Sequence, residues 1–356
     1  MMRLLQAMAG GPQGGAENFF MRLAPQLENR VSQKIFLKGY RGRIDALKDQ
    51  GLKVEQGSFT GVFALKTRLQ FFQQIQKSKP DIVLTWMNRA TFLCPSSKIF
   101  RKFLPPFLHV GRLGGFYNLK YYRNCDALIG NTKGIAKYLT EKGWPSAKVF
   151  YLPNFVEIPD LSTITPFCKT IYESSEEVPI ILTAGRLHEN KGFDTLIRAM
   201  VFLKETSLWI LGEGPQEKYL KNLARDLGVS DRVRFLGWQE NLGQFYKAAT
   251  IFVCPSRHEP LGNVILEAWA HGCPVIAADS SGPQELIASG TTGLLFPIDD
   301  VPALVHCLKE ALRTESFRNH LQKEGRRFVE KNFSKEKVVG EYLSCFELLL
   351  RQKKGT

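Results

Sequence analysis

The chain has 356 residues, of which 44% are hydrophobic and 23% charged, a composition typical of a soluble globular protein with two domains of ordinary size. No run of about 18 uninterrupted apolar residues is present, which excludes a membrane-spanning helix. The seven cysteines are scattered without a C-x-x-C pair, so we expect reduced thiols, no zinc site and a cytoplasmic location.

The net charge of +14 belongs entirely to the first half of the chain. Residues 1–165 contain 24 Lys and Arg against 10 Asp and Glu, whereas residues 166–356 contain 24 of each kind. A basic half joined to a neutral half indicates that one domain contacts an anionic surface or substrate. Acidic lipid headgroups, a phosphorylated glycolipid and nucleic acid all fit this charge, which alone does not choose among them.

The chain begins with a predicted strand, residues 4–9, a glycine-rich turn at residues 10–17 and an apolar-periodic helix at residues 19–27. Strand, glycine turn and helix form a geometry in which backbone N–H groups approach a phosphate. The spacing in this turn is not G-x-G-x-x-G, so the alternative is a tight turn whose glycines need positive φ.

Four further strands and a helix are predicted in the first half. The strands are residues 35–37, 53–54, 81–84 and 107–112, and the helix is residues 63–76. Residues 97–107, SKIFRKFLPPF, interleave three cations with apolar side chains, which suits contact with a membrane interface. The alternative is a helix that buries its apolar face and exposes its cations.

A stretch rich in Ser, Thr, Pro and Glu, residues 158–178, is the predicted linker. After it, a buried strand at residues 179–184 leads into the loop GRLHENKG and a helix at residues 193–202. Two fixed cations in such a loop suit a diphosphate, because Arg186 can bind its oxygens as a fork and Lys191 acts as a point charge. The alternative is a pair of solvated loop cations.

Residues 251–278 predict a buried strand at residues 251–254, a loop at residues 255–261, a helix over residues 262–271 and a second buried strand at residues 274–278. Glu259 lies in the loop and Glu267 in the helix, where apolar neighbours on nearly every side predict that Glu267 is buried. Free backbone N–H groups near Gly262 and Asn263 would form an anion site. A phosphate site flanked by two acids that bind hydroxyl groups matches a sugar nucleotide. The alternative is an ordinary strand–helix–strand crossover in which Glu267 has only a structural role and pairs with an Arg in the core.

These motifs occur in the order found in the retaining glycosyltransferases of family 4, which the chain resembles strongly from about residue 180 to 300 and more loosely before that. In PSRHEPLGNVILEAWAHGCPVIA, Glu259 and Glu267 match the family's E-x7-E element, and GRLHENKG matches its G-R-x-x-x-x-K-G element. In the first half, KPDIVLTW and KVFYLPNF resemble family segments.

The resemblance implies an α/β fold of two Rossmann-like domains facing a cleft, called GT-B. The expected domains are an acceptor-side domain at residues 1–165, a nucleotide-sugar-binding domain at residues 166–335 and a helix at residues 336–356 that crosses back to the first domain. The implied reaction moves a sugar from a nucleotide-diphosphate sugar to a hydroxyl with retention at the anomeric carbon. The departing phosphate oxygen is expected to accept the acceptor's proton.

The resemblance also assigns roles to residues. Arg186 and Lys191 are expected to stabilise the diphosphate, and Glu259 to bind hydroxyls of the transferred sugar; these three are the catalytic candidates. Glu267 is expected to bind the ribose hydroxyls. The remaining donor-side candidates are Gly14, Gly15, Trp238, Pro260, Leu261, Gly262 and Asn263, where Trp238 either stacks on the base or fills the core.

On the acceptor side, many relatives carry a His near the reacting centre. In this sequence His109 comes early in its strand and Arg112 lies nearer the expected position, so both are candidates. The sequence has no Asp-x-Asp metal element, so we expect no metal and no cofactor besides the nucleotide-sugar co-substrate.

The basic half predicts an anionic membrane glycolipid as acceptor, such as a lipopolysaccharide core, and a peripheral location at the inner face of the membrane. A nucleotide-sugar epimerase of the same fold remains an alternative, although extra acids or His would be expected at its cleft. A basic nucleic-acid-binding protein is another, but it would leave the two motifs without a purpose. No aromatic-studded nucleic-acid motif is present, so we expect no nucleic-acid partner.

Overall fold

The computed structural model describes residues 1–11, 14–61, 64–100, 102–168 and 177–354. The chain forms two compact units, Met1–Phe155 with Glu336–Thr356, and Val156–Lys335. Parts of four predicted features lie outside the described residues: positions 12–13 of the glycine turn, position 63 of a helix, Arg101, and positions 169–176 of the linker.

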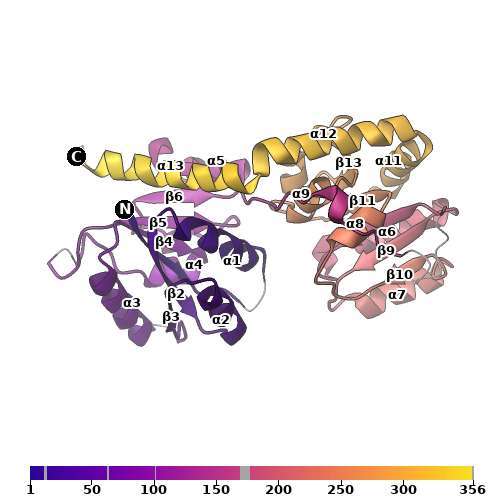
Figure 1. Ribbon diagram of the computed structural model, residues 1–356. Coiled ribbons are helices and arrows are strands. Elements are labelled where there is room, and N and C mark those ends of the chain that lie inside the picture. The colour runs from indigo at the N-terminus through magenta and orange to yellow at the C-terminus, as the bar shows by residue number, and fades with distance from the viewer. Residues whose placement is uncertain (12–13, 62–63, 101, 169–176, 355–356) are drawn as a thin grey trace. The chain divides into compact units, whose positions relative to one another are not determined.

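The first unit is built on a seven-stranded parallel sheet (Figure 1). Its strand order, β3-β2-β1-β4-β5-β6-β7, changes direction between β1 and β4. All five residues of β4 are buried, as expected for an apolar strand covered on both faces. The strands are β1 (Arg3–Met8), β2 (Ser32–Lys38), β3 (Val54–Gly57), β4 (Ile82–Trp86), β5 (Leu108–Leu113), β6 (Ala127–Gly130) and β7 (Val149–Tyr151).

Helices cover both faces of this sheet. One face packs against α1, α2 and the C-terminal helix α13, whose Tyr342 and Phe346 are fully buried in that core. The other face packs against α3, α4 and α5. The helices are α1 (Gly15–Glu28), α2 (Arg41–Asp49), α3 (Leu65–Ser78), α4 (Met87–Leu93), α5 (Lys133–Glu141) and α13 (Lys335–Lys354), with short 3-10 turns η1 (Leu119–Tyr121) and η2 (Ser146–Lys148).

The second unit repeats the architecture with a six-stranded parallel sheet in the order β10-β9-β8-β11-β12-β13. Its direction changes between β8 and β11, so these two strands are neighbours although β9 and β10 lie between them in sequence. The strands are β8 (Ile180–Ala184), β9 (Ser207–Leu211), β10 (Val233–Phe235), β11 (Ile251–Cys254), β12 (Val275–Ala278) and β13 (Leu294–Phe296).

Two cores lie on the two faces of this second sheet. The helices are α6 (Phe193–Ala199), α7 (Glu217–Asp226), α8 (Gly243–Ala248), α9 (Asn263–Ala270), α10 (Ser281–Leu286), α11 (Val301–Arg313) and α12 (Glu315–Phe333), with 3-10 turns η3 (Leu161–Thr163), η5 (Glu189–Lys191) and η6 (Met200–Phe202). Among the described helices, none combines the length and apolar character that crossing a membrane requires.

The structure departs from the sequence-based expectations in several places, of which three concern the elements and the unit boundary. Residues 97–107 form turns and irregular backbone where described, so the helix alternative for that segment is wrong. Pro105 and Pro106 explain this, because proline removes an N–H donor and disfavours helical backbone in the residue before it. The second difference is the helix α12, which has 19 residues and was not predicted from the sequence.

The third difference is the boundary between the units, which falls after Phe155, whereas the sequence placed it after residue 165. Val156 and Phe167 pack into a core of the second unit, and the Val156 N–H donates to the Phe333 carbonyl at 3.0 Å. Residues 156–168 therefore belong to the second unit, because Val156 is buried in its core and Ile158 and Phe167 pack against that core.

Candidate active site

Two motif-bearing loops of the second unit meet at the carboxyl ends of β8 and β11, where the strand order changes direction. Gly192 makes the meeting possible. Its φ is +62°, and a Cβ at this position would lie 2.1 Å from the Pro255 carbonyl oxygen. Only glycine fits both conditions, so the loop after β8 can lie directly on the loop after β11.

This close approach places Lys191 against Glu259. The Lys191 ammonium lies 2.5 Å from Glu259 Oε2, and the two side chains are 27% and 12% exposed. Burial acts to lower the pKa of Lys191, but the carboxylate outweighs it, and the net pKa is raised. The second carboxylate oxygen, Oε1, accepts from the Gly262 N–H at 3.2 Å. Lys191, which the sequence assigned to the diphosphate, and Glu259, which it assigned to the transferred sugar, thus form one ion pair.

The backbone of the loop that carries Glu259, Pro260 and Leu261 packs against Gly282 of α10. The Gly282 N–H donates to the Glu259 carbonyl at 2.8 Å. A Cβ at Gly282 would lie 2.5 Å from that oxygen and 2.9 Å from the Leu261 nitrogen. The backbone of this loop is therefore fixed by a glycine contact more than 20 residues further along the chain.

Helix α9 begins directly after this loop, with Gly262 in the left-handed conformation as its N-cap and Asn263 as its first residue. The cap residue has no side chain to accept from the first-turn N–H groups, which suits an anion at this end of the helix. Asn263 and Glu267 lie on a half-buried face, while Ile265, Leu266 and Trp269 face the core. The expectation that Glu267 is buried is therefore wrong, because the helix buries only one side.

The loops after β8 and β9 also lie close together. A Cβ at Gly212 would lie 2.0 Å from the Gly185 carbonyl oxygen, and Gly212 has φ +124°. Arg186, next to this contact, has an exposed side chain. The residue Trp238 is 60% exposed, and its backbone N–H donates to Glu213 Oε1 at 3.4 Å. The alternative that Trp238 fills the core is therefore wrong.

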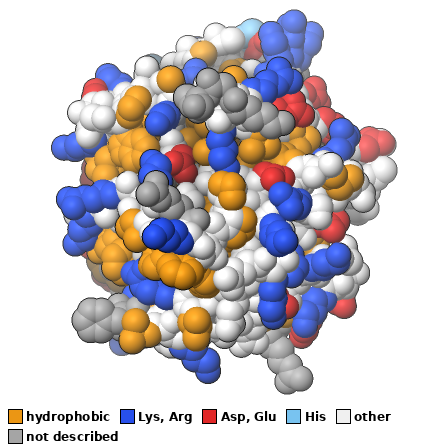
Figure 2. Space-filling model, turned by 90° about the vertical axis from the view of Figure 1, so that its left-hand side faces the viewer, with side chains coloured by type: hydrophobic (Ala, Val, Ile, Leu, Met, Phe, Trp, Pro, Cys, Tyr) orange, Lys and Arg blue, Asp and Glu red, His pale blue; other side chains and the backbone are white. Residues whose placement is uncertain are grey.

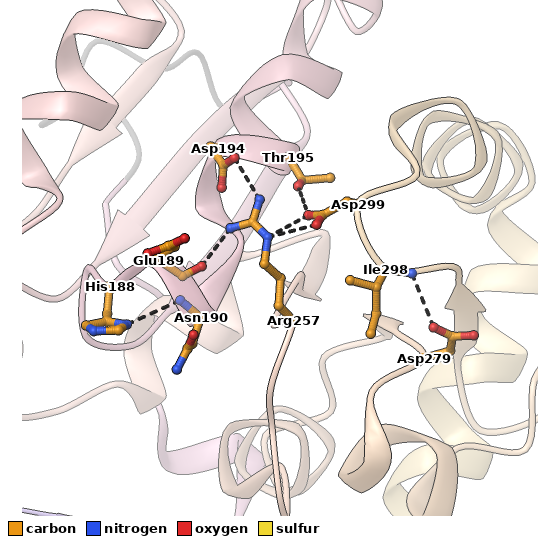
Figure 3. A network of polar contacts seen from close by, with 9 residues as sticks. All are labelled: His188, Glu189, Asn190, Asp194, Thr195, Arg257, Asp279, Ile298 and Asp299. Carbon is orange, nitrogen blue, oxygen red and sulfur yellow. Dashed lines mark hydrogen bonds and ion pairs between the residues drawn. The ribbon is translucent and has the colours of Figure 1, made fainter.

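A network around Arg257, shown in Figure 3, fixes the loops that carry Lys191 and Glu259. The Arg257 guanidinium donates to Asp194 Oδ2 at 2.8 Å, to Asp299 Oδ2 at 2.9 Å and to the Glu189 carbonyl at 2.6 Å. Thr195 donates to Asp299 Oδ1 at 2.9 Å. Three loops, after β8, β11 and β13, are thereby joined at one side chain.

The sequence did not reveal this network. Arg257 lies two residues before Glu259, but Asp194 is 63 residues away and Asp299 is 42 residues away. The charge of Arg257 holds the pKa of the Asp299 carboxyl below its usual range, chiefly through their hydrogen bond. No spacing pattern pairs these residues, because their contact depends on the strand order.

In the first unit, the glycine turn before α1 is organised around Glu17. Neither Gly14 nor Gly15 adopts the left-handed backbone conformation that favours glycine. The φ of Gly14 is 167°, which is extended backbone that any residue can adopt. The alternative of a turn that needs positive φ is therefore wrong for both. A Cβ at Gly10 or at Gly14 would lie 2.3 Å from a carboxylate oxygen of Glu17. Glu17 Oε1 accepts from the Gly11 N–H at 2.7 Å. Glycine at positions 10 and 14 leaves room for this carboxylate.

The acceptor-side candidates His109 and Arg112 are each 1% exposed. His109 Nε2 lies 2.9 Å from Thr85 Oγ1, and burial lowers the pKa of the imidazole to about 4. Arg112 donates to the Tyr342 hydroxyl at 2.7 Å and to Asn154 Oδ1 at 2.5 Å. Both side chains thus make their polar contacts inside the first unit.

No group of three or more His, Cys, Asp or Glu side chains in the described part of the chain is arranged to hold a metal ion. The charged side chains in the loops after β8, β11 and β13 and in the helices that follow them include Arg186, Lys191 and the two acids of the E-x7-E element, together with the Arg257 network.

Comparison with known proteins identifies the family. Residues 167–328 match the family model described as Glycosyl transferases group 1. LpsE of Rhizobium meliloti (strain 1021), a lipopolysaccharide core biosynthesis glycosyltransferase, is 34% identical over 338 residues, which cover 94% of this chain and 96% of LpsE. The chain belongs to the group 1 glycosyl transferases. LpsD of the same strain, also a lipopolysaccharide core biosynthesis glycosyltransferase, is 30% identical over 344 residues, covering 95% of this glycosyltransferase and 96% of LpsD.

Solved structures confirm the predicted fold. A glycosyltransferase from Rickettsia africae ESF-5 matches with a TM-score of 0.85 at 21% identity, covering 98% of each chain. Anabaena Alr3699/HepE in complex with UDP and glucose matches with a TM-score of 0.81 at 18% identity, covering 98% of this chain and 100% of that one. This glycosyltransferase therefore has the α/β, two-unit GT-B fold.

Proposed function

We propose that this glycosyltransferase moves a sugar from a nucleotide-diphosphate sugar to an acceptor hydroxyl, with retention at the anomeric carbon and without a metal ion. The observation that carries the proposal is the Lys191–Glu259 pair beside the N-terminus of α9. A cation, a carboxylate and a helix N-terminus together match a sugar joined to a phosphate. The complex of Anabaena Alr3699/HepE with UDP and glucose supports the same ligand class.

In this proposal the diphosphate lies at Arg186, Lys191 and the first turn of α9. The bond from the anomeric carbon to the phosphate oxygen breaks, and negative charge grows on the departing diphosphate. Two cations and the helix dipole stabilise that charge more in the transition state than in the ground state. The acceptor oxygen bonds to the anomeric carbon on the same face, and its proton passes to the departing phosphate oxygen.

The two acids bind hydroxyls in this proposal. Glu259 accepts from hydroxyls of the transferred sugar, since its carboxylate is already oriented by the Gly262 N–H and Lys191. Glu267 accepts from the ribose hydroxyls, for which its half-buried position on α9 is better suited than full burial. The exposed Trp238 stacks on the base.

The test is a thermal-shift screen of the full chain against UDP-, GDP- and ADP-sugars. Ligand at a hundred times its Kd adds about 2.7 kcal/mol of apparent stability. We expect one nucleotide class to stabilise the wild type but neither Lys191→Ala nor Glu267→Ala. The matched control is Lys221→Ala, because Lys221 forms an exposed ion pair with Glu217 on α7 and should respond like the wild type. No shift with any nucleotide sugar would refute donor binding.

Stereochemistry and metal use need separate readouts. The anomeric configuration of the first product, read by NMR before it equilibrates, should match that of the donor sugar. Activity should survive excess EDTA. Inversion, or loss of activity that a divalent metal restores, would refute that part of the proposal.

We further propose that the acceptor is an anionic membrane glycolipid of the lipopolysaccharide core type, reached at the inner face of the membrane. The kinship to LpsE and LpsD supports this acceptor class. So does an apolar stripe on the basic first unit, formed by exposed residues of α3, α4 and the segment after α4: Leu65, Leu69, Phe92, Ile99, Phe100 and Phe103.

Contacts join two members of the apolar stripe to α3. The ring of Phe100 lies 6.0 Å from that of Phe72 on α3, and Arg68 on α3 lies 4.9 Å from the Phe92 ring on α4. Lys66, Lys98 and Lys102 are exposed beside it. Figure 2 shows a face on which hydrophobic side chains lie among many Lys and Arg. Apolar side chains mixed with cations suit an anionic lipid surface.

Vesicle co-sedimentation tests the membrane contact. The wild type should bind vesicles of phosphatidylglycerol but not of phosphatidylcholine, and Phe103→Ser should weaken binding several-fold. Phe202→Ser is the matched control, because Phe202 is an exposed phenylalanine of the second unit. Equal binding to both lipids, or equal loss in both variants, would refute the contact. Retention on DNA in place of vesicles would favour the nucleic-acid alternative.

A further inference from the structure

A cavity of about 540 Å³ lies in the first unit, at the amino edge of its sheet. Leu108 begins β5, Asp126 directly precedes β6 and Lys148 directly precedes β7, and all three line the cavity. Its other walls are the segment after α4 and the C-terminal part of α13. Reacting ligands of parallel α/β sheets bind at the opposite, carboxyl edge, so the sugar transfer does not account for this cavity.

The floor of the cavity is apolar. Leu104 and Phe107 of the segment after α4 and Leu349 of α13 line it, and these residues are 5%, 2% and 5% exposed. Sites for small ligands are typically cavities of about 300–1,000 Å³ with mostly apolar walls and a few polar groups. The cavity therefore has the size and lining of a site for a ligand with an apolar part.

The rim of the cavity carries an excess of positive charge. Of the described residues that line the cavity, Lys98, Lys148 and Lys353 are cations and Asp126 is an acid. Asp126 Oδ1 lies 3.2 Å from the Lys98 ammonium, and its Oδ2 accepts from the His109 backbone N–H at 2.9 Å. Because these two contacts compensate the acid within the protein, the rim attracts an anionic group.

The cavity adjoins the apolar stripe along the chain. Ile99 and Phe103 of the stripe are 70% and 67% exposed, and they belong to the same segment as Lys98 and Leu104, which line the cavity. The C-terminal end of α13 lies at the left of Figure 1, on the side that faces the viewer in Figure 2. A ligand that is anionic at one end and apolar at the other matches this combination of rim, floor and stripe.

We propose that this cavity holds the headgroup region of one anionic phospholipid of the membrane. The lipid phosphate lies at Lys148 and Lys353, and the upper part of an acyl chain covers the apolar floor. The rest of the lipid stays in the bilayer beside the apolar stripe. The inference rests on the proposed membrane contact and names the residues, distinct from the stripe, that recognise the lipid headgroup.

The probes are dihexanoyl phosphatidylglycerol, dihexanoyl phosphatidylcholine and glycerol 3-phosphate, each added to the full chain, with both lipids kept below the concentration at which they form micelles. Isothermal titration calorimetry should give a Kd for phosphatidylglycerol at least tenfold lower than for the other two. The choline cation is repelled by the lysines, and glycerol 3-phosphate has no acyl chain for the floor. Equal binding of the two lipids, equally tight binding of glycerol 3-phosphate, or no binding of phosphatidylglycerol would overturn the proposal.

Two variants test the rim and the interior of the cavity separately. Lys148→Met combined with Lys353→Met should raise the Kd for dihexanoyl phosphatidylglycerol at least tenfold. Ser97→Trp should do the same, because Ser97 lines the cavity and an indole would fill it. The matched controls, Lys142→Met and Ser32→Trp, change exposed side chains of the first unit outside the cavity and should bind like the wild type. Wild-type affinity in both cavity variants would overturn the proposal.

Phe103→Ser separates the cavity from the apolar stripe. It should weaken vesicle binding but leave the Kd for the soluble phosphatidylglycerol unchanged, because Phe103 does not line the cavity. The variant without the two lysines should lose affinity for the soluble lipid and part of its preference for anionic vesicles. Vesicle binding by the wild type without binding of the soluble lipid would overturn this inference alone, whereas loss of both would refute the proposed membrane contact as well.

Discussion

Replacing Arg257 by Met removes a guanidinium that joins three loops while keeping the length of the side chain. The guanidinium makes charge-assisted hydrogen bonds to Asp194 and Asp299 and a third to the Glu189 carbonyl. The side chains of Arg257, Asp194 and Asp299 are 26%, 21% and 48% exposed. A hydrogen bond to a charged group stabilises by about 1.5–3 kcal/mol when sheltered, and an exposed ion pair by about 0.2–1 kcal/mol.

The better-sheltered Asp194 contact therefore dominates, and we expect Arg257→Met to lower the free energy of unfolding by about 2–3 kcal/mol. Arg232→Met is the matched control, since Arg232 is 20% exposed and donates to the carbonyls of Met200 and Leu203 away from the motif loops. Urea unfolding followed by tryptophan fluorescence should give similar losses for the two variants.

Activity should separate the two variants. Lys191 lies two residues after Glu189, and Glu259 two residues after Arg257, so the network sets the positions of both. Misplacement of transition-state contacts lowers kcat, and about 1.4 kcal/mol corresponds to a factor of ten. We expect kcat to fall at least tenfold in Arg257→Met with a smaller change in KM. Equal kcat values for the two variants at temperatures where both are folded would refute the positioning role.

Three further predictions follow from single contacts. Gly192→Ala should destabilise the protein by about 3 kcal/mol, because its Cβ would meet the Pro255 oxygen at 2.1 Å, whereas Gly228→Ala, with a similar φ of +66° and open space, should lose only about 1 kcal/mol. Trp238→Leu should change the free energy of unfolding by less than about 0.5 kcal/mol but weaken nucleotide-sugar binding by about 1–3 kcal/mol, and an unchanged Kd would exclude stacking. The raised pKa of Lys191 means that its ion pair stabilises the protein fully below the unfolded-state pKa of about 10.4 and is lost as the pH rises through the folded-state value. Thermal midpoints measured from about pH 9 to 11.5 should show this alkaline loss of stability in the wild type but not in Glu259→Gln, which lacks the carboxylate partner of Lys191.

The sequence determined the local elements of the second unit well. The bounds of β11, Ile251–Cys254, were predicted from the apolar run alone, because a strand covered on both faces must be apolar at every position. The glycine-bounded loops after β8 and β11 were also placed correctly, since turn residues have strong local preferences. These local signals, with the order of the motifs, were sufficient to predict the fold and the family.

Only the tertiary structure decided which side chains meet. Lys191 and Glu259 are 68 residues apart, and their contact exists because β8 and β11 are neighbours in the sheet. Local periodicity carries no information about that order, so the Arg257 network could not be predicted either. The half-burial of Glu267 depended on which side of α9 faces the core.

The glycine turn before α1 shows the same limit in the first unit. Its composition indicated either a phosphate site or positive φ, and the structure instead places the Glu17 carboxylate in it. Neighbouring residues define a turn, but what fills it depends on side-chain packing in three dimensions. The residues around Gly114 come from α1 and from the loops after β5 and β6, and only the folded sheet brings them together.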